Sequence, residues 1–174
     1  MREEPLRVIS TLLAENPTLV RVLFVVAAAS STVLGWLLHR FGRSRALGVL
    51  TAVGLLGALA LTLSPSGARA AVFCTVQFSV PFRGLDTLAN VAMMLPLALL
   101  AALRFRRPWV VVAAVSGLSA LIELFQALVP ALGRACDTDD WFMNTVGAAL
   151  GGVLAALIVT VEAGRRARAV RRNP

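Results

Sequence analysis

The sequence predicts an all-α, polytopic membrane protein: a bundle of about five transmembrane helices with a short interfacial helix at the N-terminus. Hydrophobic residues make up 58% of the 174 residues, and the mean hydropathy is +0.80. Soluble domains contain about 45–50% apolar residues. The apolar residues also fall in blocks of roughly 18–22, the length that crosses about 30 Å of hydrocarbon as a helix. The chain is therefore expected to be a single integral membrane domain over residues 1–174.

Each element follows from the hydropathy pattern. Residues 5–15 place Leu6, Ile9 and Leu13 near one face, which suits a short helix lying on the membrane surface. The long connection at 64–83 contains an apolar stretch too short to cross the membrane, which either dips into it or lies across the mouth of the bundle. The predicted spans are 19–38, 46–63, 85–103, 109–129 and 141–161, followed by a basic tail at 164–174.

The arginine residues predict the orientation. The net charge of +8 comes entirely from arginine, and three clusters, at 40–45, 104–107 and 165–172, fall on one side of a five-span bundle. Because positive loops stay in the cytoplasm, the N-terminus is expected outside and the C-terminus in the cytoplasm. A pI near 11.6 also fits a nucleic-acid-binding protein. Membrane orientation explains arginines in short flanking loops better, so no nucleic-acid partner is expected.

Three pairs of polar residues lie within or at the start of the predicted spans, all near the outer end. The members of each pair are three or four residues apart, so they share a helix face. Carboxylates and amides are costly in hydrocarbon, and a cluster of them is a candidate functional site. The pairs are Asp86 with Asn90, Glu123 with Gln126, and Asp140 with Asn144.

Other residues extend this cluster. Gly147 and Gly151 continue the stripe of Asn144 and form a small-residue seam that allows another helix to approach closely. Cys74 and Cys136 both fall in outward connections, where the compartment permits disulfides. A bridge between them is therefore favoured over two free thiols.

The polar cluster has a structural and a functional interpretation. Interhelical hydrogen bonds alone explain one polar pair. Three pairs at one depth favour a ligand-binding or catalytic site. Arg134 either neutralises Glu123 or Asp140 as a structural ion pair, which is the favoured case, or contacts an anionic ligand. The candidate ligand-binding residues are Asp86, Asn90, Glu123, Gln126, Arg134, Asp137, Asp140 and Asn144.

Several chemistries are disfavoured. Asp137, Asp139 and Asp140 offer oxygen ligands for Mg²⁺ or Ca²⁺, but no calcium-loop spacing is present. No metal or cofactor is therefore expected. The sequence has no Ser-His-Asp set, Cys-His pair, HExxH motif or phosphate-binding glycine loop. Several common hydrolase and nucleotide-dependent mechanisms are disfavoured for that reason.

The spacing of these residues resembles the VanZ-like membrane protein family over about residues 84–152. Met93, Met94 and Ala98 depart from the aromatic residue and glycine often found near the proline of the third span. The resemblance implies a bacterial membrane and a cell-envelope role, with a link to resistance against teicoplanin-type glycopeptides, and it implies no reaction. The pattern is Asp86-x-x-x-Asn90, Pro96, Glu123-x-x-Gln126 and Arg134-x-x-Asp137-x-x-Asp140-x-x-x-Asn144-x-x-Gly147-x-x-x-Gly151.

The leading expectation is recognition or modulation of an amphiphilic envelope molecule, a lipid-linked glycan or a lipoglycopeptide, without turnover. Glycan hydroxyls suit a site rich in acids better than a bare phosphate does. The alternative is a membrane enzyme in which Asp86 or Glu123 transfers a proton and Arg134 acts as electrophile. Ion-coupled transport is disfavoured, because the inner half of the spans is expected to be apolar. Membrane lipids are the expected surroundings, and the sequence predicts no oligomeric state.

Overall fold

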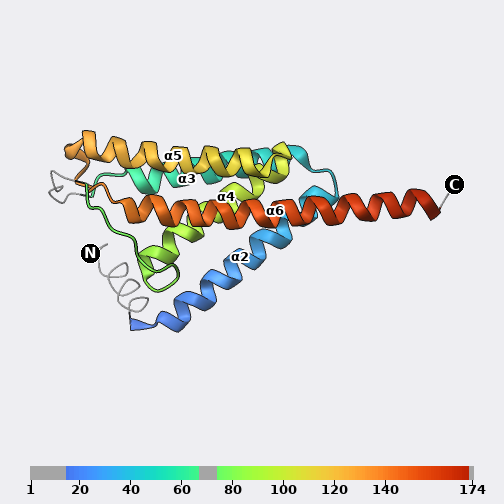
Figure 1. Cartoon of the computed structure of the whole chain (residues 1–174), viewed down its shortest axis with the longest axis horizontal. Helices are drawn as coiled ribbons and strands as arrows, with labels where there is room; N and C mark the ends of the chain where they lie inside the picture. Colours follow the sequence, from blue (N-terminus) through green and yellow to red (C-terminus); the bar gives the residue numbers. More distant parts are fainter. Residues whose placement is uncertain (1–14, 67–73, 173–174) are drawn as a thin grey trace, which may run out of the picture.

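The computed structural model describes residues 15–66 and 74–172, in which five long helices form one bundle (Figure 1). All five are long and apolar enough to cross a membrane, so the predicted all-α, multi-pass fold is confirmed. The helices are α2 (Pro17–Arg40), α3 (Ser44–Leu63), α4 (Leu85–Phe105), α5 (Pro108–Leu128) and α6 (Thr138–Arg172), with a 3-10 turn, η1 (Pro130–Leu132), before α6.

The predictions for the two ends of the chain have different outcomes. Apart from Glu15, the interfacial helix expected at 5–15 lies outside the described residues. The expected basic tail is, as far as Arg172, a continuation of α6. Alanine and arginine are good helix formers, which explains why the helix does not stop where the apolar span stops. α6 has 35 residues, and it extends beyond the other helices at its C-terminal end (Figure 1).

α4 is the central helix of the bundle and packs against the other four long helices. Its Val91, Met94 and Ala98 are fully buried. In contrast, α2 and α3 bury few side chains and expose large apolar residues such as Val25 and Leu56. Such faces suit contact with lipid tails, which are as apolar as the side chains themselves.

Two glycines on α6 allow it to pack closely on α4. A Cβ at Gly147 would lie 2.6 Å from the Val91 carbonyl oxygen, and one at Gly151 would lie 2.8 Å from the Leu99 nitrogen. Real side chains cannot occupy such positions, so only glycine permits this contact. The close approach predicted for this seam is confirmed, and it sets the distance between the two helices that carry most of the candidate site.

The bundle has two chemically different ends. At the disulfide end, α4 begins, α5 ends and α6 begins. At the arginine end lie the α2–α3 turn, the α4–α5 turn and the C-terminal part of α6, with the three predicted arginine clusters (Figure 1). The polar pairs of the candidate site all belong to the disulfide end.

Candidate ligand-binding site

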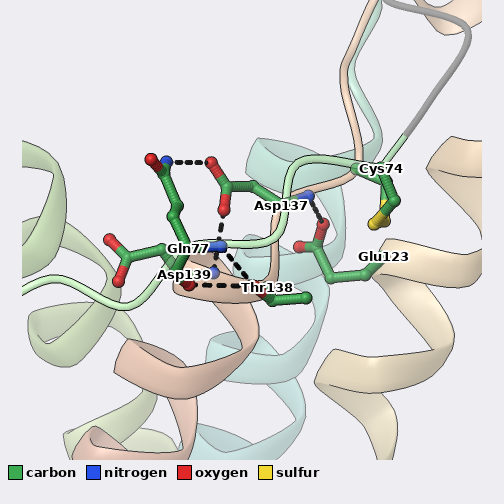
Figure 2. The surroundings of a disulfide bond; sticks show 7 residues. Cys74, Gln77, Glu123, Asp137, Thr138 and Asp139 are labelled. Carbon is green, nitrogen blue, oxygen red and sulfur yellow. Dashed lines mark hydrogen bonds between the residues drawn. A yellow bond between two sulfur atoms is a disulfide. The ribbon is translucent and has the colours of Figure 1, made fainter.

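An extended segment, residues 74–80, lies beside the start of α6 (Figure 2). The Thr75 N–H donates to the Cys136 carbonyl at 2.9 Å, and the Thr138 N–H donates to the Thr75 carbonyl at 3.1 Å, as in a parallel strand pair. Two residues further on, the Gln77 N–H donates to Thr138 Oγ1 at 3.0 Å, and the Thr138 hydroxyl donates to the Gln77 carbonyl at 2.8 Å. These bonds satisfy backbone groups that would otherwise be unpaired near the membrane.

A disulfide between Cys74 and Cys136 fastens this segment to the connection before α6 (Figure 2). The two Cα atoms are 4.5 Å apart, and 62 positions separate the residues in sequence. This is the pairing that the sequence favours. A covalent link over so long a loop restricts the unfolded chain and holds the segment in place in the folded one.

Two carboxylates at the start of α6 also bind the extended segment (Figure 2). Asp137 accepts from the Gln77 side-chain amide at 2.6 Å and from the Asp139 N–H at 2.8 Å. Asp139 accepts from the Ser79 N–H at 2.6 Å. Negative charge at a helix N-terminus is favourable, because the unpaired N–H groups there carry partial positive charge. Part of the acidic cluster is therefore structural.

Glu123 lies behind this loop, near the end of α5. It is buried, and its carboxylate accepts from the Asp137 N–H at 2.8 Å (Figure 2). Glu123 does not line the open cleft described next. Glu123 therefore holds the Asp137 backbone in place, next to the acids that line the cleft.

The acids and amides of α4 and α6 meet in an open cleft of about 960 Å³ at the disulfide end. Across it, the Asn90 amide donates to Asp140 Oδ1 at 2.5 Å, which links α4 to α6. Phe78, Val80 and Ala89 give the lining apolar patches. The charged residues of the lining are Arg83, Asp86, Arg134, Asp137, Asp139 and Asp140.

Arg134 does not form the ion pair that the sequence favours with Glu123 or Asp140. Its Nε instead donates to the Ser64 carbonyl at 2.8 Å, which ties the turn before α6 to the end of α3. Glu123 accepts from the Asp137 backbone and Asp140 from the Asn90 amide instead. Arg134 still lines the cleft, so a ligand can reach it.

Three predicted site residues lie outside the cleft lining: Glu123, described above, and two others. Gln126 donates to the Thr62 carbonyl at 2.9 Å and joins α5 to α3. Asn144 is almost fully buried and donates to Ser119 Oγ at 2.9 Å, while its own Oδ1 has no hydrogen-bond partner in the described structure. Both residues form hydrogen bonds between helices, which is the role that the structural interpretation gives to the polar pairs. The structure thus brings five predicted residues together in the cleft: Asp86, Asn90, Arg134, Asp137 and Asp140.

Sequence reasoning missed the residues that build the wall of the cleft. Gln77 and Ser79 alternate with apolar Val76, Phe78 and Val80, the period-two pattern of an extended segment. Thr138, directly before two acids, is a typical residue type for a helix N-terminus. Both signals are present in the sequence, although neither says where the segment docks.

At the arginine end, one more buried acid was missed. Glu162 of α6 accepts from Trp36 Nε1 at 2.9 Å and lies 3.7 Å from Arg40 and 3.4 Å from Arg165. The prediction of an apolar inner half concerned the spans themselves and did not include Glu162. The residue lies just past the predicted last span, where a helical continuation was not expected.

Comparison with known proteins gives one family. The family model VanZ/LLP1 matches residues 24–159, which extends well beyond the polar motif to include most of α2 and all of α3. Among curated proteins and solved structures, none matches the chain. Because the match spans most of the sequence, the chain belongs to the VanZ/LLP1 family of membrane proteins, a family linked to teicoplanin resistance.

Proposed function

We propose that this protein recognises an amphiphilic cell-envelope molecule, a lipid-linked glycan or a lipoglycopeptide, in the cleft at the disulfide end, without turning it over. The observation that carries the proposal is a cleft in which four carboxylates form no ion pair with the described part of the chain. Within residues 15–66 and 74–172, the ion pairs found all belong to Glu162 at the other end. The cleft acids are Asp86, Asp137, Asp139 and Asp140.

The chemistry of the cleft supports a hydroxyl-rich ligand. Carboxylates accept hydrogen bonds from hydroxyls, and amides such as Asn90 both donate and accept. The volume of about 960 Å³ is at the upper end of the range for small-molecule sites, about 300–1,000 Å³. A site at the end of an apolar bundle suits a molecule whose head is polar and whose tail stays in lipid.

The proposal requires the disulfide end to face outward. The arginine asymmetry and the disulfide both support that orientation. A membrane-impermeant thiol reagent applied to intact cells tests it. Arg107→Cys, at the arginine end, is expected to stay unlabelled, and Ala131→Cys, at the disulfide end, to be labelled. Surface labelling of Arg107→Cys alone would reverse the orientation and remove the proposal.

Ligand binding tests the function itself. Purified protein in lipid nanodiscs is expected to bind a teicoplanin-type lipoglycopeptide or a lipid-linked glycan, and to release it with unchanged mass. Asp86→Asn combined with Asp140→Asn is expected to weaken binding at least about tenfold, because each lost charge-assisted hydrogen bond is worth about 1.5–3 kcal/mol. A chemically altered ligand would indicate an enzyme instead. Undiminished binding by the folded double variant would place the site elsewhere.

A further inference from the structure

A second pocket adjoins the cleft on the side of α2. Its volume is about 140 Å³, and Arg83 and Gly84 line both this pocket and the cleft. Arg21, in the first turns of α2, lines the pocket as well. Two arginines, one on α2 and one directly before α4, therefore line one small pocket that shares Arg83 and Gly84 with the acidic cleft.

These two arginines have no protein partner within residues 15–66 and 74–172. Neither Arg21 nor Arg83 forms an ion pair or a side-chain hydrogen bond there. A guanidinium at the edge of the hydrocarbon either extends toward water or pairs with an anion. Extension toward water explains a single arginine. Two arginines that line one pocket match the bidentate binding of a phosphate.

The backbone beside Arg83 is unusual. Phe82 has a φ of 68°, in the left-handed region that bulky residues rarely adopt. Its ring lies 5.9 Å, centroid to centroid, from the ring of Phe24 on α2. Backbone of this kind persists where the surroundings hold it, and it clusters at ligand sites. Here it holds the residue before Arg83 against α2, next to the turn that carries Arg21.

An apolar seam continues from the two arginines along α2 and α4. The lining residues recur at spacings of three and four on each helix, so they continue the stripe that begins at Val20 and Leu88. α2 diverges from α6 toward its N-terminal end (Figure 1), and its flank exposes large apolar side chains. An apolar chain can therefore reach the seam from the lipid. The seam is lined by Phe24, Ala27, Ala28, Ala92, Leu95 and Pro96, among others.

We propose that the ligand of the cleft is a phosphate-linked amphiphile. Its hydroxyl-rich head lies among the cleft acids, its phosphate binds Arg21 and Arg83, and its apolar chain follows the seam between α2 and α4. This inference rests on the proposed function and narrows its ligand class to a lipid-linked glycan joined through phosphate. It also removes the conflict between acids and phosphate, because Arg21 lines the small pocket and the acids of α6 line the cleft alone.

Three synthetic amphiphiles test this arrangement on the wild-type protein in neutral-lipid nanodiscs. The first joins a disaccharide to an apolar chain through a pyrophosphate, the second joins the same parts through an uncharged ether, and the third carries the pyrophosphate and chain without sugar. We expect the first to bind at least about tenfold more tightly than either of the others, because each lacks one set of polar contacts. Inorganic phosphate alone is expected not to compete.

The outcomes separate the inference from the proposed function. Equal affinity for the first and second amphiphiles would overturn the phosphate site and leave glycan recognition standing. Equal affinity for the first and third would mean a general anionic-lipid site and would overturn the link to the glycan. Effective competition by inorganic phosphate would overturn the need for an amphiphile. Binding of none of the three would overturn the proposed function as well.

Variants then assign the phosphate to the two arginines. Arg21→Gln with Arg83→Gln is expected to bind the pyrophosphate and ether amphiphiles within about twofold of each other. Arg21→Gln alone, at a residue that lines the small pocket and not the cleft, is expected to lower the affinity for the pyrophosphate form and to keep that for the ether form. Arg107→Gln with Arg168→Gln removes the same charge at the arginine end and is the matched control. A preference for phosphate that survives in the first double variant would overturn the assignment. Because the ether form reports an intact cleft, a misfolded variant is recognised directly.

Discussion

The acidic residues at the two ends of the bundle are held in different ways. At the arginine end, Glu162 accepts from Trp36 and lies between Arg40 and Arg165, so both its charge and its hydrogen-bonding capacity are matched. At the disulfide end, four carboxylates line one open cleft and form no ion pair with the described part of the chain. Asp137 and Asp139 accept hydrogen bonds from backbone and amide groups, whereas Asp86 accepts none from residues 15–66 and 74–172.

This difference shows how a structural acid is distinguished from a functional one in a membrane bundle. A buried acid that serves packing requires matched partners, since an unpaired charge in a poorly solvated place is destabilising. Glu162 meets that requirement. In the cleft, Asp137, Asp139 and Asp140 accept hydrogen bonds that hold neighbouring groups, but their negative charge is left without an ion pair in the described residues, and packing does not require that charge. A ligand with many hydroxyl donors would form hydrogen bonds with these carboxylates.

The largest expected effect on stability comes from the disulfide. Cys74→Ser with Cys136→Ser is expected to lower the free energy of unfolding by about 2–4 kcal/mol, because the unfolded chain regains the entropy of a long loop. Thermal unfolding in detergent measures the change. Reduced wild-type protein is the control and is expected to match the double variant, while an unchanged unfolding temperature in both would contradict a bridge that fixes the cleft wall.

A smaller effect is expected at Glu123. Glu123→Leu leaves the Asp137 N–H without its acceptor, a loss of about 1–3 kcal/mol. Glu123→Gln retains an oxygen that can accept the same bond, so its unfolding temperature is expected to stay nearer that of the wild type. If the two variants unfold at the same temperature, the charge of Glu123 and not its hydrogen bond holds the loop.

The smallest effect is expected in the buried contact between α5 and α6. Ser119→Ala removes the acceptor of the Asn144 amide and is expected to cost about 0.5–1.5 kcal/mol. Adding Asn144→Leu removes the unpaired amide and is expected to recover most of that loss, which a double-mutant cycle measures. Ligand binding is expected to stay unchanged throughout. A loss of ligand binding in the stable double variant would show that Asn144 belongs to the ligand-binding site.

The fold was largely predictable because hydropathy is a local property. Twenty consecutive apolar residues have few alternatives to a membrane span, and the predicted span 85–103 differs from α4 by only two residues at one end. The end of α6 was not predictable from hydropathy. Residues after Val161 include Glu162 and five arginines, and the segment stays helical because of backbone propensity and the contacts of Glu162.

The site was predictable only in part, because spacing gives a helix face but not its neighbour. The sequence placed Asn90 and Asp140 near the outer ends of two different spans, and the hydrogen bond between them depends on how α4 packs against α6. Asn144, one turn further along α6, already faces Ser119 of α5. The docking of residues 74–80 depends on long-range pairing with the start of α6, which no local pattern encodes. The proximity of Arg21 to Arg83 likewise depends on how the N-terminal part of α2 is placed relative to α4.

Two single substitutions, one at each end of the bundle, test the difference between the cleft acids and Glu162 most directly. Asp140→Asn and Glu162→Gln each remove one carboxylate charge and keep an oxygen that can accept a hydrogen bond. Protein abundance, unfolding temperature and teicoplanin susceptibility per molecule of folded protein are measured for both. We predict that Asp140→Asn folds as well as the wild type and loses the susceptibility phenotype, whereas Glu162→Gln unfolds at a lower temperature and keeps it. A full phenotype in Asp140→Asn, together with loss of stability at both ends, would show that the cleft acids serve packing alone.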